Sequence, residues 1–299
     1  MRFLTFFRNG ESRVGVLRGE SVLDITTQAK PLAGPLSLDA SNLIALIASG
    51  QAGLDAVCKL LQAPAEGDIP LTELKLLAPI PRPRKNVFCV GWNYLDHFAE
   101  GQAIRQSGQE LPAYPVFFSK TPTAVTGPYE TIPYNAQVSA EIDWEVELGV
   151  IIGKNGKNIP ENRAHEYIFG YTVVNDISAR DLQRRHGGQW LKGKSLDGAC
   201  PMGPWIVTAD EINPDNLRVL TRVNGVVKQD SNTRYLYFKI PRLISELSSG
   251  MTLEAGDIIS TGTPRGVGFV RKPPEFLKPG DLLETEIEGI GCLQNRIGG

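Results

Sequence analysis

The sequence predicts a strand-rich α+β fold. Its 299 residues include 31 glycines and 21 prolines, which favour strands joined by turns over long helices. Residues 141–153 alternate acidic and apolar side chains and then become apolar on both faces, as expected of a strand that enters a covered sheet. Asn224-Gly225 lies between two short apolar runs and is a strong hairpin signal.

Composition excludes several classes of partner. The net charge is −2, so no overall field favours nucleic acid or an anionic membrane. No apolar run approaches the roughly 20 residues needed to span a bilayer, and the polar start does not resemble a signal peptide. The four cysteines contain no Cys-x-x-Cys pair. We therefore expect a cytoplasmic protein that binds neither nucleic acid nor membrane.

The first quarter of the chain has the pattern of a small α+β unit. Residues 41–61 have a helical pattern with a break near Ser49, and alternating prolines within residues 78–85 mark a boundary. We therefore predict an accessory domain at 1–77 and a main domain at 78–299. The strands expected in the accessory domain are residues 2–7, 12–17 and 21–25.

The main domain is expected to consist mostly of strands, with a few short helices. Residues 110–123 contain several prolines and are expected to be irregular. The other elements expected here are strands at 87–90 and 171–176, a helix that starts within 93–100, and helices at 177–186 and 241–247.

Acidic residues gather on one face of the predicted strand at 141–153. Glu141, Asp143, Glu145 and Glu147 share this face, and Asp176 ends another apolar run. Carboxylates that converge on one point are hard oxygen ligands, suited to Mg²⁺, Mn²⁺ or Ca²⁺. The alternative is a solvated acidic face paired with lysines. The apolar continuation of the strand indicates that the carboxylates are at least partly covered.

Three histidines are the candidate bases near neutral pH. His97 and Glu100 are three residues apart, so on a helix the carboxylate can orient the imidazole. The alternative is a surface histidine beside an incidental acid. His165 follows a polar stretch and is expected at the surface, and His186 ends a predicted helix, where a C-terminal cation is the plain explanation.

Other polar residues could contact a ligand. Lys194 follows a glycine, which permits close approach, although a plain surface lysine is an equal alternative. Arg180 and Gln183 follow Asp176 by four and seven residues and can project from one helix face, or else belong to a solvated face. Residues 262–268 are glycine-rich but match no phosphate-binding loop.

Taken together, these segments resemble the fumarylacetoacetate hydrolase family over residues 80–297. The N-terminal part is similar to the small accessory domain of many prokaryotic members. The motifs that carry the resemblance are Gly91-Trp-Asn-Tyr-x-x-His97-x-x-Glu100, Glu145-x-Glu147-Leu-Gly-Val-Ile-Ile-Gly153, Asn175-Asp176-Ile-Ser-Ala-Arg180-Asp-x-Gln183, Gly193-Lys194-Ser-x-Asp and Gly262-Thr-Pro264.

The resemblance implies a mixed β-sandwich roll, a homodimer, and one divalent cation per subunit, either Mg²⁺ or Mn²⁺ with Ca²⁺ possible. By the family pattern Glu145, Glu147 and Asp176 are the metal ligands. The eukaryotic enzyme that names the family takes a further Asp ligand at the place of Val90, so this chain resembles the three-ligand branch.

The same resemblance implies roles for the remaining residues. His97 and Glu100 would form a general-base dyad on a lid at about 93–113, and Lys194 would offset the charge of a departing enolate. The residues implied to contact the substrate are Arg180, Gln183 and Thr263.

The expected reaction is metal-dependent hydrolysis of a C–C bond in a 2,4-dioxo acid such as an acylpyruvate or fumarylpyruvate, in catabolism of aromatic or related compounds. His97 would activate the attacking water. The alternatives on the same scaffold are an oxaloacetate decarboxylase and a 2-hydroxyhepta-2,4-diene-1,7-dioate (hydroxymuconate-type) isomerase. A non-catalytic, metal-stabilised binding protein is a third possibility, against which the pair of His97 and Glu100 argues.

Overall fold

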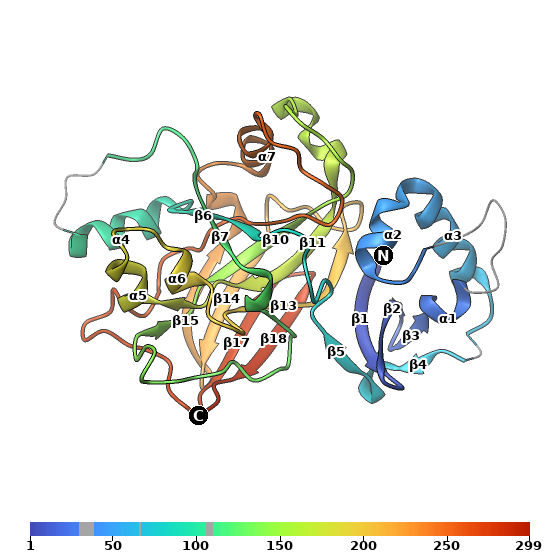
Figure 1. The fold of residues 1–299 in the computed structure, drawn as a ribbon, viewed down its shortest axis with the longest axis horizontal. Helices are drawn as coiled ribbons and strands as arrows, with labels where there is room; N and C mark the ends of the chain where they lie inside the picture. Colours follow the sequence, from blue (N-terminus) through green and yellow to red (C-terminus); the bar gives the residue numbers. More distant parts are fainter. Residues whose placement is uncertain (30–38, 66, 106–109) are drawn as a thin grey trace.

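The computed structural model describes residues 1–29, 39–65, 67–105 and 110–299. Two sheets dominate it (Figure 1). The larger has the order β4 (Ile69–Pro70), β3 (Ser21–Asp24), β2 (Glu11–Arg18), β1 (Arg2–Arg8), β13 (Cys200–Thr208), β11 (Ile168–Asn175), β10 (Val146–Ile152), β16 (Ile258–Ser260), β6 (Val87–Gly91) and β7 (Val116–Lys120). The smaller has the order β15 (Val226–Asn232), β14 (Arg218–Val223), β17 (Leu282–Ile287) and β18 (Gly291–Arg296).

Short strands and helices complete the fold. The remaining strands are β5 (Lys75–Leu77), paired with β1, β8 (Val125–Thr126), paired with β13, and β9 (Ile142–Asp143), paired with β12 (Ser178–Ala179). The α-helices are α1 (Ile25–Ala29), α2 (Leu43–Ala48), α3 (Gly50–Gln62), α4 (Leu95–Arg105), α5 (Arg180–Arg185), α6 (Leu191–Lys194) and α7 (Ile240–Ser248). The 3₁₀ helices are η1 (Leu71–Glu73), η2 (Pro122–Ala124), η3 (Glu161–Tyr167) and η4 (Thr233–Tyr235). The strand-rich α+β class is thereby confirmed.

A hydrophobic core lies between the two sheets and extends to α7. Alternate residues of β10 and β11 point into it because both strands are covered on this side. The smaller sheet and α7 supply the opposing side chains. Members of this core include Leu148, Val150, Val173, Val219, Ile244, Ile287 and Leu293.

The N-terminal unit continues the larger sheet. β1 pairs antiparallel with β13, with Phe3 opposite Ile206, and apolar side chains from both parts of the chain share one core. The three predicted strands are confirmed, and so is the helix break, since Ser49 ends α2 and Gly50 begins α3. The division into domains at 77/78 stays a prediction.

Three expected elements differ from the structure. The segment expected to be irregular contains β7, because the run Val116–Lys120, between Pro115 and Pro122, is free of proline and pairs with β6. The predicted helix after Asp176 begins only at Arg180, behind β12. The predicted strand 141–153 is interrupted between β9 and β10. At the break, backbone N–H groups bond to side chains instead of a neighbouring strand: Glu145 N–H donates to Asn175 Oδ1 (3.0 Å).

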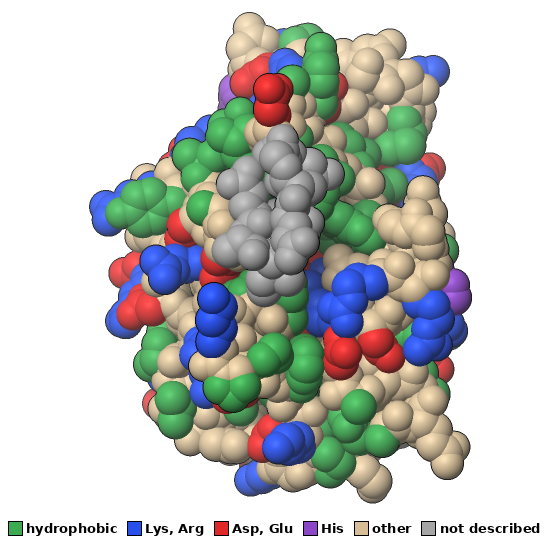
Figure 2. All heavy atoms as spheres, turned by 90° about the vertical axis from the view of Figure 1, so that its left-hand side faces the viewer, with side chains coloured by type: hydrophobic (Ala, Val, Ile, Leu, Met, Phe, Trp, Pro, Cys, Tyr) green, Lys and Arg blue, Asp and Glu red, His purple; other side chains and the backbone are tan. Residues whose placement is uncertain are grey.

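The hairpin at Asn224-Gly225 is confirmed, since these residues link β14 to β15 with φ of 51° and 76°. Within the described ranges, no helix combines the length and apolar character that a membrane crossing requires. The face that carries α4, α5 and α6 presents several Lys and Arg side chains (Figure 2). Asp and Glu side chains lie among them on the same face (Figure 2).

Candidate metal centre and active site

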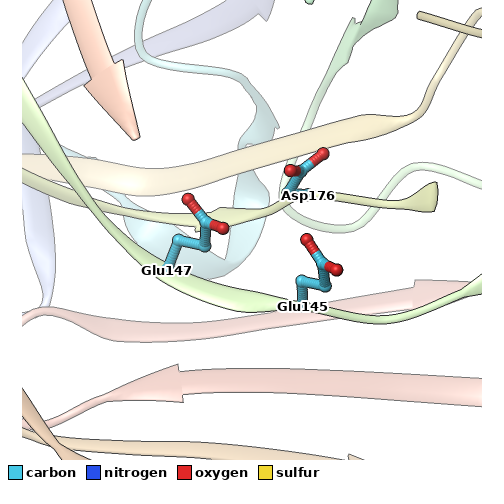
Figure 3. A group of neighbouring side chains, drawn as sticks. All are labelled: Glu145, Glu147 and Asp176. Carbon is cyan, nitrogen blue, oxygen red and sulfur yellow. The ribbon is translucent and has the colours of Figure 1, made fainter. Parts of the chain in front are cut away.

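Three carboxylates meet at the start of β10 and the end of β11. Glu145 directly precedes β10, Glu147 lies within it, and Asp176 directly follows β11, its antiparallel neighbour. The Asp176 N–H donates to the Glu145 carbonyl at 2.9 Å, which places the two side chains together. The three groups offer oxygen atoms within 4.8 Å of one another and converge on a common space (Figure 3). All three residues are buried, so the solvated-face alternative is wrong.

Two lysines neutralise part of this acidic group. The Lys194 Nζ lies 2.7 Å from both Glu145 Oε2 and Asp176 Oδ2, and the Lys120 Nζ lies 2.6 Å from Asp176 Oδ1. Both lysine side chains are buried. The carboxylates of Asp176 and Glu145 outweigh the effect of burial and raise the pKa of Lys194, so it stays charged.

The carboxylate of Glu147 lacks such a cationic contact within the described part of the chain. Its Oε2 accepts hydrogen bonds from Ser260 Oγ (2.6 Å) and the Gly262 N–H (2.9 Å). Burial and the charges of Asp176 and Glu145 raise its pKa well above the usual range. Burial acts in the same direction on Glu145, but Lys194 and other nearby cations outweigh it and lower the pKa of that carboxyl.

The donor set fits a divalent cation. Four buried carboxylates face three buried cations here, so with all four carboxylates ionised and a divalent cation bound the local charge would be +1. A positive centre suits an anionic substrate. Carboxylate oxygens select Mg²⁺, Mn²⁺ or Ca²⁺ over softer metals. The residues in this count are Asp143, Glu145, Glu147 and Asp176 against Lys120, Arg180 and Lys194.

His97 and Glu100 are in contact, as their spacing on a helix predicted. His97 Nδ1 lies 2.8 Å from Glu100 Oε1, and Glu100 also accepts from the Gly266 N–H at 2.9 Å. His97 is buried, so the surface-histidine alternative is wrong, whereas His165 is exposed as expected and His186 is exposed as well. Because Nδ1 is engaged with Glu100, proton exchange with a bound molecule falls to Nε2.

One cavity of about 420 Å³ brings most predicted residues together. Arg180 and Gln183 share a hydrogen bond of 3.1 Å on its wall, so they project from one face as predicted. Asp176 and Glu100 lie behind the lining, in contact with residues that reach the cavity. The other predicted residues in the lining are His97, Glu145, Glu147, Lys194 and Thr263. The lining also contains aromatic side chains, which were not predicted: Trp92, Phe118, Trp190 and Phe269.

Four residues around the cavity were not predicted to have a role. Lys120 and Asp143 form buried ion pairs, and Gln229 donates from Nε2 to Thr263 Oγ1 (2.8 Å). Gly266 supplies the N–H that holds Glu100. Asp143 shares the acidic strand face with the metal-ligand candidates, a signal that could have identified it. The others have no local signal, because their partners are distant in the sequence.

The predicted lid at 93–113 contains α4, while its residues 106–109 lie outside the described part. Asn93, fully buried, anchors the start of α4 by donating from Nδ2 to the carbonyls of Thr261 (2.8 Å) and Phe238 (3.0 Å). Near the middle of α4, Glu100 docks on Gly266. Asn93 and Glu100 thus hold the start and the middle of α4, and His97, between them in the sequence, lines the cavity, so a ligand there can stabilise α4.

Oxalate with Mg²⁺ should therefore slow amide hydrogen exchange in α4, because a bound 2-oxo acid mimic gives His97 a partner and closes the cavity over it. Exchange monitored by mass spectrometry, with peptides of α3 as the internal control, measures this. Equal exchange in α4 with and without saturating oxalate would contradict a lid.

The fold and the site together define a carboxylate-rich cavity that could hold a cation, with a buried histidine in its wall. The family model "Fumarylacetoacetate (FAA) hydrolase C-terminal" matches residues 86–298. The chain belongs to the fumarylacetoacetate hydrolase family, as the motifs indicated.

Known relatives and solved structures agree with this assignment. Oxaloacetate tautomerase FAHD2A, mitochondrial, of Bos taurus is 44% identical over 292 residues, which cover 90% of each chain. A fumarylacetoacetate hydrolase structure from Exiguobacterium antarcticum has a TM-score of 0.84 at 38% identity, covering 100% of this chain and 99% of that one. A maleylpyruvate hydrolase from Sphingobium sp. SYK-6, solved with manganese(II) and pyruvate, has a TM-score of 0.76 at 31% identity, with coverage of 100% and 99%. These relatives are enzymes, and they support an enzymatic role here.

Proposed function

We propose that this protein is a divalent-metal-dependent tautomerase that interconverts the keto and enol forms of oxaloacetate. The observation that carries the proposal is that a buried carboxylate triad and the His97 dyad share one cavity. Tautomerisation is accelerated by a cation that polarises the 2-oxo group and by a group that moves a proton, and these residues can supply both. The 44% identical relative named for this reaction supports the substrate.

The residues of the chain have distinct tasks in this reaction. Glu145, Glu147 and Asp176 would hold the cation, which when bound supplies Lewis-acid polarisation of the 2-oxo group. His97 Nε2 takes the proton from C3, the electron pair forms the C2–C3 double bond, and a proton is returned to the C2 oxygen. Glu100 stabilises the imidazolium formed in between, through its contact with Nδ1. Mg²⁺ and Mn²⁺ both suit the donor set.

The cavity wall suits a small dianion. Arg180 and Arg184 line the cavity, and their charges attract a carboxylate, which would share Arg180 with Asp143 and Glu145 and share Arg184 with Glu141. Arg180 is buried, which strengthens its interaction with an anion by excluding water. The aromatic walls exclude water from the proton transfer. The predicted homodimer and cytoplasmic location remain part of this proposal.

The C–C bond hydrolase expected from the family resemblance is the second candidate. It is favoured by the maleylpyruvate hydrolase neighbour and by a dyad that can also activate water. The two candidates differ in whether His97 takes its proton from the substrate or from water. The Bos taurus oxaloacetate tautomerase gives partial support to both alternatives expected from the resemblance. Tautomerisation is an isomerisation, as in the isomerase alternative, and oxaloacetate is also the substrate of the decarboxylase alternative.

A direct comparison of substrates tests the proposal. With Mg²⁺ or Mn²⁺, the protein should accelerate the loss of enol-oxaloacetate absorbance without releasing pyruvate, because no C–C bond breaks. The same preparation is assayed with maleylpyruvate and an acylpyruvate. If the protein cleaves maleylpyruvate or the acylpyruvate and does not accelerate the loss of enol-oxaloacetate, the tautomerase proposal is overturned and the hydrolase is favoured. Pyruvate release from oxaloacetate would instead identify the decarboxylase.

A further inference from the structure

Asp143 is a buried carboxylate outside the acidic triad. Its side chain is 0% exposed and accepts hydrogen bonds from several directions. Oδ1 accepts from the N–H groups of Trp144 (2.8 Å) and Gly268 (2.6 Å), while Oδ2 accepts from the Phe269 N–H (3.0 Å) and from Arg180 Nε (2.9 Å). A charge this well solvated by donors is fixed in place. It is therefore a rigid acceptor for Arg180.

The guanidinium of Arg180 is shared between two carboxylates. Its Nη2 lies 2.8 Å from Asp143 Oδ2 and 2.6 Å from Glu145 Oε1. Its Nη1 donates to Gln183 Oε1, and the ring of Phe269 lies 4.4 Å from the guanidinium carbon. Asp143 thus takes the Nε–Nη2 edge, the edge that could otherwise form a two-bond pair with Glu145. Arg180 therefore gives Glu145 Oε1 a single N–H, while Lys194 contacts the other oxygen, Oε2.

We propose that Asp143 is a positioning residue that prevents Arg180 from capturing Glu145 and so keeps Glu145 available to a metal ion. A cation and a guanidinium compete for the same carboxylate oxygens. Without the negative charge of Asp143, the freed edge of Arg180 would turn to Glu145, and the metal would have to displace it. The inference rests on the proposed cation site at Glu145, Glu147 and Asp176.

Asp143 also has a structural role that a test must separate from this one. It holds the Gly268 and Phe269 amides of the loop whose Gly266 anchors Glu100. Gly268 also packs against the Glu275 backbone too closely to admit a side chain, and its carbonyl accepts from the Glu275 N–H. Loss of Asp143 could therefore act through the loop as well as through Arg180.

A double-mutant cycle with Asp143→Asn and Arg180→Gln distinguishes the two routes. Mn²⁺ affinity is measured by the paramagnetic resonance signal of free Mn²⁺, and folding of each variant by circular dichroism and Tm in EDTA. Asp143→Asn alone should weaken Mn²⁺ binding about 10- to 100-fold, the range typical for partners of metal ligands. Arg180→Gln alone should bind Mn²⁺ at least as tightly as the parent, because the competitor is absent.

The decisive variant is the double one. In the Arg180→Gln background, Asp143→Asn should change the Mn²⁺ affinity by no more than about twofold. Arg185→Gln is the matched control: its exposed guanidinium pairs with Asp181, so the loss from Asp143→Asn should persist beside it.

Two results would overturn the positioning role while leaving the metal site intact: the same loss from Asp143→Asn with and without Arg180, or weaker Mn²⁺ binding in Arg180→Gln alone. Weaker Mn²⁺ binding in Arg180→Gln alone would refute the positioning role even if the Asp143→Asn variant does not fold. Absence of Mn²⁺ binding by the parent protein would instead refute the metal site itself, and this inference with it.

Discussion

Replacing Glu147 with Gln should abolish tight Mn²⁺ binding and raise the Tm of the metal-free protein. The side chain keeps its size and can still accept from Ser260 and Gly262, but it loses the charge that a cation requires. Affinity should fall by more than the roughly 10- to 100-fold typical of an outer partner, since a ligand itself is removed. Titration calorimetry with Mn²⁺ measures this loss.

The two effects have opposite signs for one reason. The raised pKa of Glu147 means that its ionised form is less favourable in the folded protein than in the unfolded one, so at neutral pH the charge destabilises the metal-free fold. A neutral amide removes this cost, and Tm in EDTA should rise by a few degrees. With saturating Mn²⁺ the order should reverse, because only the parent gains stability from the metal.

Glu141→Gln is the matched control for this experiment. Glu141 belongs to the same run of acidic residues but lies outside the cavity, with its Oε2 2.6 Å from Arg184 Nη2 at the half-exposed surface. Its replacement should leave Mn²⁺ affinity unchanged. Retention of parent-like affinity by Glu147→Gln, or an equal loss in both variants, would refute Glu147 as a ligand.

The metal-ligand candidates could be predicted because their signals are local in the sequence. Glu145 and Glu147 are two residues apart in one strand segment, and Asp176 ends the next long strand, so antiparallel pairing is sufficient to bring them together. The contact between His97 and Glu100 could be predicted in the same way, since a helix places residues three apart on one face. Periodicity predicts which side chains are neighbours, whereas the ligand role of Glu145, Glu147 and Asp176 and the base role of His97 are implied by the family resemblance.

The charge balance of the site could not be predicted in this way. Lys120, which contacts Asp176, is 56 residues away in the sequence and ends β7, a strand that was not predicted because its flanking prolines indicated irregular structure. Lys194 was expected to face an enolate, and in the structure its ammonium group contacts two of the carboxylates. Such contacts depend on how sheets and loops pack, which no periodicity encodes. The interruption of the strand before β10 was missed for the same reason, because side chains supply its hydrogen bonds.

The loop after β16 connects these parts. Its Thr261 carbonyl holds Asn93 at the start of α4, its Gly262 N–H holds Glu147, and its Gly266 N–H holds Glu100. The loop therefore fixes the proton-transfer dyad relative to the cation site. This arrangement explains why a glycine-rich segment without any phosphate-binding pattern belongs to the active site.

His97→Ala should reduce tautomerase activity by about 10²- to 10⁴-fold, the range expected for loss of a general base. Mn²⁺ affinity should hardly change, because the candidate ligands are the three converging carboxylates and not the imidazole. Stopped-flow measurement of enol-oxaloacetate loss gives the rate. His165→Ala is the matched control, since it removes an exposed histidine, and it should retain parent activity.

Glu100→Gln separates proton transfer from mere packing. The carboxylate accepts from both His97 Nδ1 and the Gly266 N–H, whereas an amide has a single acceptor oxygen. If that oxygen stays on Gly266, the amide nitrogen donates to Nδ1, the proton moves to Nε2, and the base is lost from the cavity side. A large fall in kcat with little change in KM is therefore expected. A parent-like kcat in Glu100→Gln would show that the dyad does not set the tautomer of His97. A loss of Mn²⁺ affinity in His97→Ala equal to its loss of activity would show that His97 acts through the metal site rather than as the base.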